Sequence, residues 1–106
     1  MNEEALVLAE LVRAAEESRP LILATVIATR GSVPRHAGSK MIIDPATGAM
    51  VGTIGGGCGE ADVIAAADDV AKSGMPRCIH VELLDSIDSF SPAVCGGVMD
   101  IFVEKV

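Results

Sequence analysis

The sequence predicts an α/β fold: one domain over residues 1–106, with a mixed sheet of about five strands and two helices. Three observations support this prediction. The length suits one compact domain. Apolar residues recur with helical spacing in two segments and with strand spacing in several others. Glycine-rich stretches separate these segments, and we expect them to gather as loops at one end of the sheet.

Two segments have the apolar spacing of amphipathic helices. In residues 2–18, Asn2 is a suitable N-cap and Pro20 lies just beyond the end. In residues 60–73 the apolar positions again repeat every three to four residues, and Gly74 follows directly. Each helix therefore has one face for the sheet and one for solvent.

The first strand, residues 21–29, is apolar on both of its alternating faces. Such a pattern is typical of a central strand that is covered on both sides. Residues 40–44 and 49–54 read as two further strands. The turn-forming residues around Pro45 and Gly48 join them, which predicts a β-hairpin.

Two strands follow the second helix. Residues 77–84 alternate between apolar and polar positions, which indicates a half-exposed strand. Residues 98–103 form the last strand, and Asp100 interrupts its apolar run. We expect Asp100 to face the edge of the sheet.

The charge of the chain limits its ligands. A net charge of −7 argues against nucleic acid, which selects a basic face. Residues 20–59, however, hold Arg30, Arg35 and Lys40 against only Asp44, a local charge of +2 that leaves −9 for the remainder. A locally basic, glycine-rich segment suits a small anionic ligand.

Cysteine usage and hydropathy indicate the compartment. The three cysteines have no paired spacing, which argues against a disulfide framework and disfavours a structural zinc site. No apolar run approaches the ~20 residues of a membrane span, and no signal segment is recognisable. These features predict a cytoplasmic protein.

The most unusual stretch is residues 52–60, in which five glycines surround Cys58. Such a loop permits left-handed backbone or a close approach to a ligand. Cys58 precedes a helix N-terminus, where amide groups and the helix dipole favour a thiolate or a bound anion. The spacing matches neither a Walker A motif nor G-x-G-x-x-G. The alternative is a tight strand-to-helix turn with an inert cysteine.

Three further residues have two interpretations each. Cys95 also lies beside glycines at the start of a strand, so Cys58 and Cys95 could meet and ligate a soft metal, carry a persulfide or form a reversible disulfide. Free cysteines are otherwise small buried hydrophobes. Glu60 is either a general base beside Cys58 or a favourable carboxylate in the first helical turn. His36 is either a proton shuttle or simply exposed.

The loop of residues 29–38 adds hydrogen-bonding and basic groups. Arg30, Ser32 and Arg35 are suitable partners for a phosphate held by the backbone amides of the glycine loop. The alternative for both arginines is solvated loop charge.

Three motifs together resemble the xanthine dehydrogenase accessory factor family (XdhC/CoxI). They are T-x-G-S-x-P-R-x-x-G at residues 29–38, G-T-I-G-G-G-C-x-E at residues 52–60 and C-G-G at residues 95–97. Their order and intervals fit the family over nearly the whole chain.

The resemblance implies a chaperone that binds molybdenum cofactor, assists its sulfuration and delivers it to a xanthine or carbon monoxide dehydrogenase-type molybdenum hydroxylase. Its partners would be that apoenzyme and a cysteine desulfurase. Cys58, Cys95 and Glu60 would be the reactive groups, with Cys58 a contact of the molybdenum. The implied cofactor-binding residues are Ser32, Arg35, Gly55, Gly56, Gly57, Cys58 and Cys95.

Members of the family typically continue into a C-terminal Rossmann-like domain, which these 106 residues lack. Either a separate Rossmann-domain chain would then supply it, or these residues would form a stand-alone carrier with a reduced role. Two alternatives stay open: a thiol-dependent sulfur carrier or redox protein that uses Cys58, and an interaction module that binds no ligand itself. We also expect a homodimer, because the edge strands of a small sheet need covering.

Overall fold

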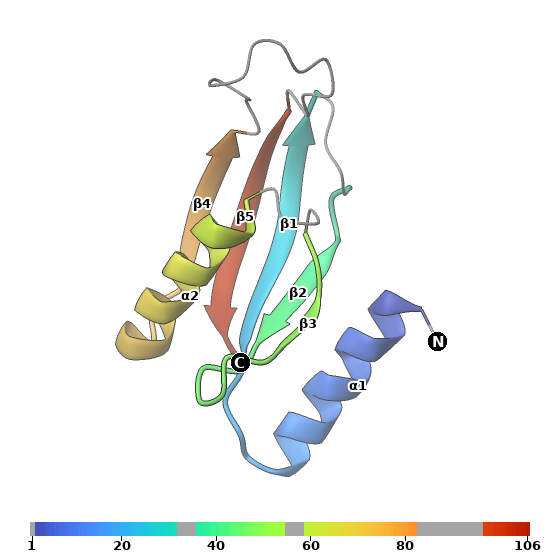
Figure 1. Cartoon of the computed structure of the whole chain (residues 1–106), viewed down its shortest axis with the longest axis vertical. Coiled ribbons are helices and arrows are strands. Elements are labelled where there is room, and N and C mark those ends of the chain that lie inside the picture. Colours follow the sequence, from blue (N-terminus) through green and yellow to red (C-terminus); the bar gives the residue numbers. More distant parts are fainter. Residues whose placement is uncertain (1, 32–35, 55–58, 83–96) are drawn as a thin grey trace.

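The computed structural model describes residues 2–31, 36–54, 59–82 and 97–106. Their strands form one five-stranded sheet in the order β3-β2-β1-β5-β4, with two helices packed on it (Figure 1). The elements are α1 (Glu3–Glu16), β1 (Ile22–Arg30), β2 (Lys40–Ile43), β3 (Met50–Gly52), α2 (Glu60–Ser73), β4 (Arg77–Glu82) and β5 (Val98–Lys105).

The α/β class, the five strands and the two helices agree with the prediction, but every strand pairing is antiparallel rather than mixed. The reason lies in the connections. The helix α2 joins β3 to β4, which run in the same direction but lie at opposite edges of the sheet. The last strand, β5, runs antiparallel between β4 and β1, so no two parallel strands become neighbours.

The larger core lies between α2 and one face of the sheet. The inward positions of α2 are all apolar and buried: Val63, Ala66, Ala67 and Val70. They pack on side chains that alternate along β1, β4 and β5, chiefly Ile22, Ala24, Val26, Val81, Met99, Ile101 and Val103. Because aliphatic side chains fill this layer, the fold needs almost no aromatic residues.

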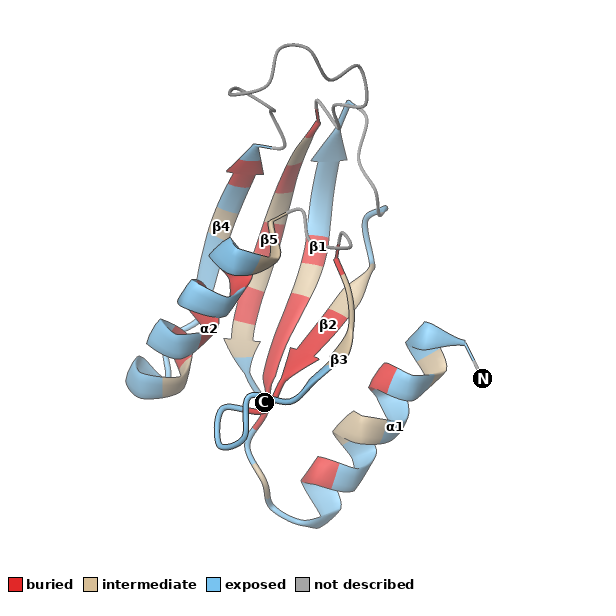
Figure 2. Cartoon of the chain, viewed as in Figure 1, coloured by how far each residue is buried: buried red, intermediate tan, exposed pale blue. Residues whose placement is uncertain are grey.

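The smaller core lies on the opposite face, under α1. Val7 and Ala14 of α1 are buried with Leu21, Leu23 and Ile42. The main sheet contacts of α1 are with β2 and β3. Figure 2 shows the result: α1 is largely exposed, whereas α2 has a buried stripe against the sheet.

The central strand β1 is covered on both sides only in its first half. Ile22, Ala24 and Val26 are buried toward α2, and Leu23 toward α1. The second half, residues 27–30, is exposed (Figure 2). The prediction of double coverage is therefore confirmed for the first half and wrong for the second, because α1 lies over β2 and β3 instead.

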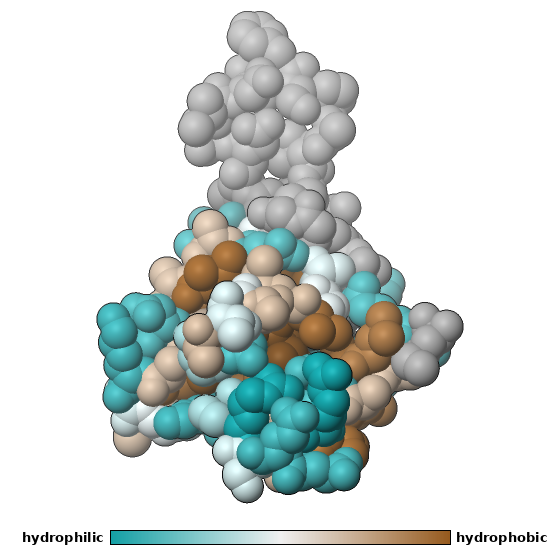
Figure 3. Space-filling view, turned by 60° about the horizontal axis from the view of Figure 1, so that its bottom comes forward, coloured by the Kyte–Doolittle hydropathy of each residue, from teal (hydrophilic) through white to brown (hydrophobic). Residues whose placement is uncertain are grey.

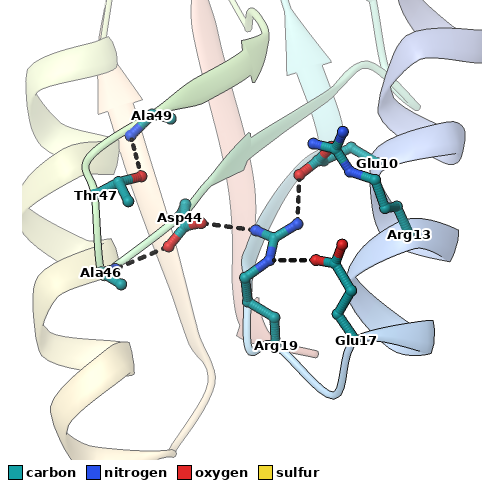
Figure 4. Close-up of polar contacts among 8 residues, drawn as sticks. All are labelled: Glu10, Arg13, Glu17, Arg19, Asp44, Ala46, Thr47 and Ala49. Carbon is teal, nitrogen blue, oxygen red and sulfur yellow. Dashed lines mark hydrogen bonds and ion pairs between the residues drawn. The ribbon is translucent and has the colours of Figure 1, made fainter.

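An ion-pair network around Arg19 lies at one end of the molecule (Figure 4). Its guanidinium donates to Asp44 Oδ2 at 2.7 Å, to Glu10 Oε2 at 2.8 Å and to Glu17 Oε1 at 3.0 Å. The network links α1 to the turn between β2 and β3. Figure 3 brings this end forward and shows hydrophilic side chains gathered there.

The network lowers the pKa of two carboxyl groups. The backbone N–H of Ala46 donates to Asp44, and this bond, followed by Arg19, holds the pKa of Asp44 below its usual value. The hydrogen bond from Arg19 likewise lowers the pKa of Glu10. Both carboxyl groups are thereby stabilised in the charged form.

Candidate functional site

Described residues that flank the predicted motifs lie at one end of the sheet, opposite the Arg19 network and uppermost in Figure 1. The strand β1 ends at Arg30, β4 ends at Glu82 and β5 begins at Val98. Val98 is paired with Arg30 on one side and with Glu82 on the other. The first motif therefore leaves the sheet beside the point where the third motif enters it.

The glycine loop returns to the same end through Gly59, the N-cap of α2. Gly59 has a φ of +79°, and a Cβ atom there would lie 2.9 Å from Val81 Cγ1 and 3.8 Å from Met99 Cε. Val81 and Met99 are paired next to the ends of β4 and β5. Glycine adopts this left-handed φ without strain and leaves the space that Val81 occupies. Residue 59 can therefore pack against the ends of β4 and β5.

A hydrogen bond joins the residues on the two sides of residues 55–58. The Thr53 hydroxyl donates a short hydrogen bond to Glu60 Oε2, and Ile54 between them is fully buried. Glu60 is the first residue of α2 and is half-buried. This position agrees with the interpretation of Glu60 as a first-turn carboxylate, and it adds a positioning contact that spacing alone did not reveal. A role as general base stays a prediction.

Most of the predicted binding residues lie outside the described residues. These are Ser32, Arg35, Gly55, Gly56, Gly57, Cys58 and Cys95. Their roles stay predictions. Of the other candidates, Arg30 and His36 are both exposed, and Arg30 stands at the end of β1 where the first motif begins.

A polar pair that the sequence analysis missed lies between β4 and β5. His80 Nδ1 is 2.7 Å from Asp100 Oδ1, and His80 Nε2 is 3.8 Å from Glu82 Oε1. The expectation that Asp100 faces an edge is wrong, because β5 lies between β1 and β4. Asp100 instead alternates with Met99 and Ile101, which face α2, and so lies on the opposite sheet face. Only the strand register could have revealed this pair.

Cys78 lies on the same sheet face as His80, two residues earlier on β4, and is a free, exposed thiol. The plain alternation of its strand predicts a structural role for Cys78, and the structure places it near the start of β4, away from the end of the sheet at Glu82. Cys78 is therefore a suitable control residue for experiments on the other two cysteines.

The fold defines a class of protein: a small α/β domain in which two helices pack on a five-stranded antiparallel sheet. The chain belongs to the XdhC and CoxI family, whose model matches residues 14–82.

Individual relatives agree with this assignment. The chain is 32% identical to the uncharacterized protein YqeB of Escherichia coli K12 over 94 residues, which are 89% of this chain and 17% of that protein. It is 28% identical to a Bacillus subtilis 168 protein described as a probable xanthine dehydrogenase subunit, over 95 residues that are 86% of this chain and 28% of that protein.

A solved structure shows the same fold. The crystal structure of a xanthine dehydrogenase from Bacillus halodurans superposes with a TM-score of 0.77 at 30% identity, covering 100% of this chain and 31% of that one. The chain thus spans less than a third of the length of each of these relatives. Within the described residues, no helix has the length and apolar character required to cross a membrane.

Proposed function

We propose that this domain binds molybdenum cofactor as cargo and acts in the maturation of a molybdenum hydroxylase of the xanthine or carbon monoxide dehydrogenase type. Family membership and two relatives named as xanthine dehydrogenase proteins link the chain to such enzymes. Binding, sulfuration and delivery of the cofactor are the proposal.

The observation that carries the proposal is the meeting of the motif boundaries at one end of the sheet. Arg30 is paired with Val98, and Gly59 lies against Val81 and Met99 next to this pair, so one flank of each of the three motifs is near this end. Arg30 is exposed at the end of β1 on the sheet face opposite α2, and on the α2 side Gly59 has no side chain to accept from the amide groups of the first turn of α2. A guanidinium and helical amides are suitable donors to a phosphate or to molybdate oxygens.

The predicted residues would then have different roles in binding the cofactor. Ser32, Arg35 and the glycines at 55–57 would hold the anionic groups of the cargo, and Cys58 and Cys95 would contact the molybdenum or carry sulfur. Glu60, bonded to Thr53, would position the loop. A cysteine desulfurase would supply sulfur, the apoenzyme would receive the cargo and a separate Rossmann-domain chain would assist. This work would take place in the cytoplasm.

The test is an anaerobic spectral titration of the chain with molybdenum cofactor. Wild type should bind, and Cys58→Ser and Cys95→Ser should each weaken binding by about tenfold or more, ~1.4 kcal/mol. Cys78→Ser is the matched control and should bind as wild type does. Absence of binding by the wild type, or equal binding by all four proteins, would overturn the proposal.

A further inference from the structure

The helix α1 has an apolar flank that the described part of the chain leaves largely uncovered. Successive helix residues are turned by about 100°, so Val7 and Ala14 share the face that packs on the sheet. Leu11, Leu8 and Val12 follow on one side of that face, and Leu8 and Val12 are 51% and 59% exposed. Because one contact with a sheet needs a stripe of only roughly 100°, this flank is available for a second contact.

The sheet face beside this flank is also uncovered. It is the face of β1, β5 and β4 opposite α2, and we call it the open half-sheet. Residues alternate along β5, so Phe102 and Glu104 lie on this face, opposite Ile101 and Val103, which are buried under α2. Phe102 is half-buried beside the exposed Cys78 of β4. Among the described elements, α1 contacts chiefly β2 and β3 and leaves these side chains open.

A groove of about 480 Å³ joins the flank of α1 to the open half-sheet. The helix contributes Leu11 and Ala15 to the groove, and the sheet side contributes Leu21, Leu23 and Val106. Since α1 lies on β2 and β3, it rises about one helix diameter, or 10 Å, above the sheet next to the open half-sheet. A second sheet would pack at about the same height and would meet α1 at its side. The space therefore suits a helix that lies beside α1 and on the strands.

The dimensions of the open half-sheet agree with one helix. Three strands spaced by ~4.8 Å span about 10 Å, which is the diameter of a helix. The strand β5 has eight residues and is therefore about 26 Å long, and α1 with 14 residues is about 21 Å long. A helix of about four turns would contact α1 along one side and the strands along its base.

The charges around the groove indicate the kind of helix. Glu104 is paired with Leu23 and is half-buried, and it forms no ion pair with any residue that the structure describes. A carboxylate beside apolar side chains is stabilised by a cation that donates hydrogen bonds to it. Glu4 and Glu16 are exposed on the same side of α1 as Leu8, so the rim is acidic as well.

The basic residues of this sheet face lie away from Glu104. Arg30 is at the far end of β1, and His80 is held by Asp100 toward the same end. The net charge of −7 has the same sign as the groove. An apolar groove with an unpaired carboxylate therefore complements a helix that has an apolar stripe and a basic residue.

We infer that the groove and the open half-sheet bind one amphipathic helix of a partner protein, which carries a lysine or arginine that pairs with Glu104. This inference goes beyond the proposed function, because the surface binds without cofactor. Recognition of an amphipathic helix in a groove is a common mode of protein association. The contact of a single helix is small, which predicts weak, transient binding with a Kd of about 10–100 μM.

The test is a titration of the chain against two labelled helical peptides, followed by fluorescence anisotropy. Each peptide has about 18 residues, a leucine stripe and a neutral polar face. One has a lysine at the centre of the stripe, and the other has a glutamate there. Wild type should bind the lysine peptide about tenfold more tightly, and Glu104→Gln should reduce this preference to about twofold or less.

Two leucines of α1 provide a matched pair of variants. Leu8→Gln, on the flank that faces the groove, should weaken binding of both peptides by about fivefold or more. Leu6→Gln is the control, because Leu6 is 47% exposed on the other flank and should leave binding unchanged. Glutamine is neutral and favours helix, so neither change alters the charge of the groove or breaks α1. Equal affinities of the two variants would overturn the inference.

Alkylation of Cys78 tests the same surface on the unmodified chain, so the test does not depend on the folding of a variant. The lysine peptide should slow the reaction of this thiol, followed by mass spectrometry, because the bound helix lies beside it on β5. An unchanged rate, equal binding of the two peptides by wild type, or no binding up to about 1 mM would overturn the inference. If Leu8→Gln instead dissociated copies of the free chain in sedimentation, a second copy would be the occupant and the inference would be wrong.

Discussion

The two helices have equal length and similar apolar periodicity, but they are held in different ways. Four residues of α2 are buried, namely Val63, Ala66, Ala67 and Val70. Only two residues of α1 are buried, Val7 and Ala14. The reason is position, because α2 lies over the longer strands β1, β4 and β5, whereas α1 lies over the short strands β2 and β3. Periodicity thus predicts an apolar face but not how much of it the same chain will bury. The helix α1 is positioned instead by the close approach of Val7 to Gly52 and by the ion pairs of Arg19.

The largest effect should come from the close contact beneath α1. Gly52 has a φ of +82°, and a Cβ there would lie 2.6 Å from the Lys40 carbonyl oxygen and 2.9 Å from Val7 Cγ2. Left-handed strain and overpacking together should make Gly52→Ala cost about 3 kcal/mol in the free energy of unfolding. Urea unfolding measures this cost. Gly48→Ala is the control: its φ is +79° with open space around it, so it should cost about 1 kcal/mol. Equal costs would show that α1 does not require the close contact.

The next effect compares one buried valine from each helix. Val63 of α2 and Val7 of α1 are both at most 1% exposed. Val63→Ala should cost about 2–3 kcal/mol, because the central core cannot collapse around the cavity. Val7→Ala should cost about 1 kcal/mol, because α1 can shift toward the sheet. Unfolding in denaturant at one pH would measure both values, and a larger cost for Val7 would reverse our comparison of the helices.

The smallest effect should come from Arg19→Gln, and it should depend on pH. The folded-state pKa values of Asp44 and Glu10 are lowered, so their contribution is full above the ordinary carboxyl range and is lost as pH falls through the folded values. The variant should therefore melt a few degrees below wild type at pH 7, and the gap should close below about pH 4. Salt should also narrow it. A gap that persists at low pH would mean that Arg19 acts through packing.

Local patterns predicted the elements well. Residues 60–73 were predicted as a helix and form one with those bounds, because Gly59 and Gly74 both take left-handed conformations that end regular structure. The hairpin of β2 and β3 and its turn at Asp44 are also confirmed. In each case the determining residues are close together in the sequence.

Features that join distant segments were not predictable in this way. The exposure of Ile27, the pairing of His80 with Asp100 and the network around Arg19 all depend on strand order or on where α1 rests. For the site, the motifs indicated which residues to examine, and the register between Arg30 and Val98 explains why two of the motifs meet. The spacing of Thr53 and Glu60 gave no signal of their hydrogen bond.

The position of β5 also bears on how the chain folds. The most extensive strand pairing in the sheet joins β1 to β5. Residues 22–30 therefore cannot complete their pairing until residues 98–105 are present. Contacts between such distant segments carry a large loop-closure cost and slow folding. During synthesis β1 leaves the ribosome long before β5, and its apolar residues are exposed to solvent until β5 follows. We therefore expect a late, single folding step, and a nascent chain that depends on protection until its last strand is made.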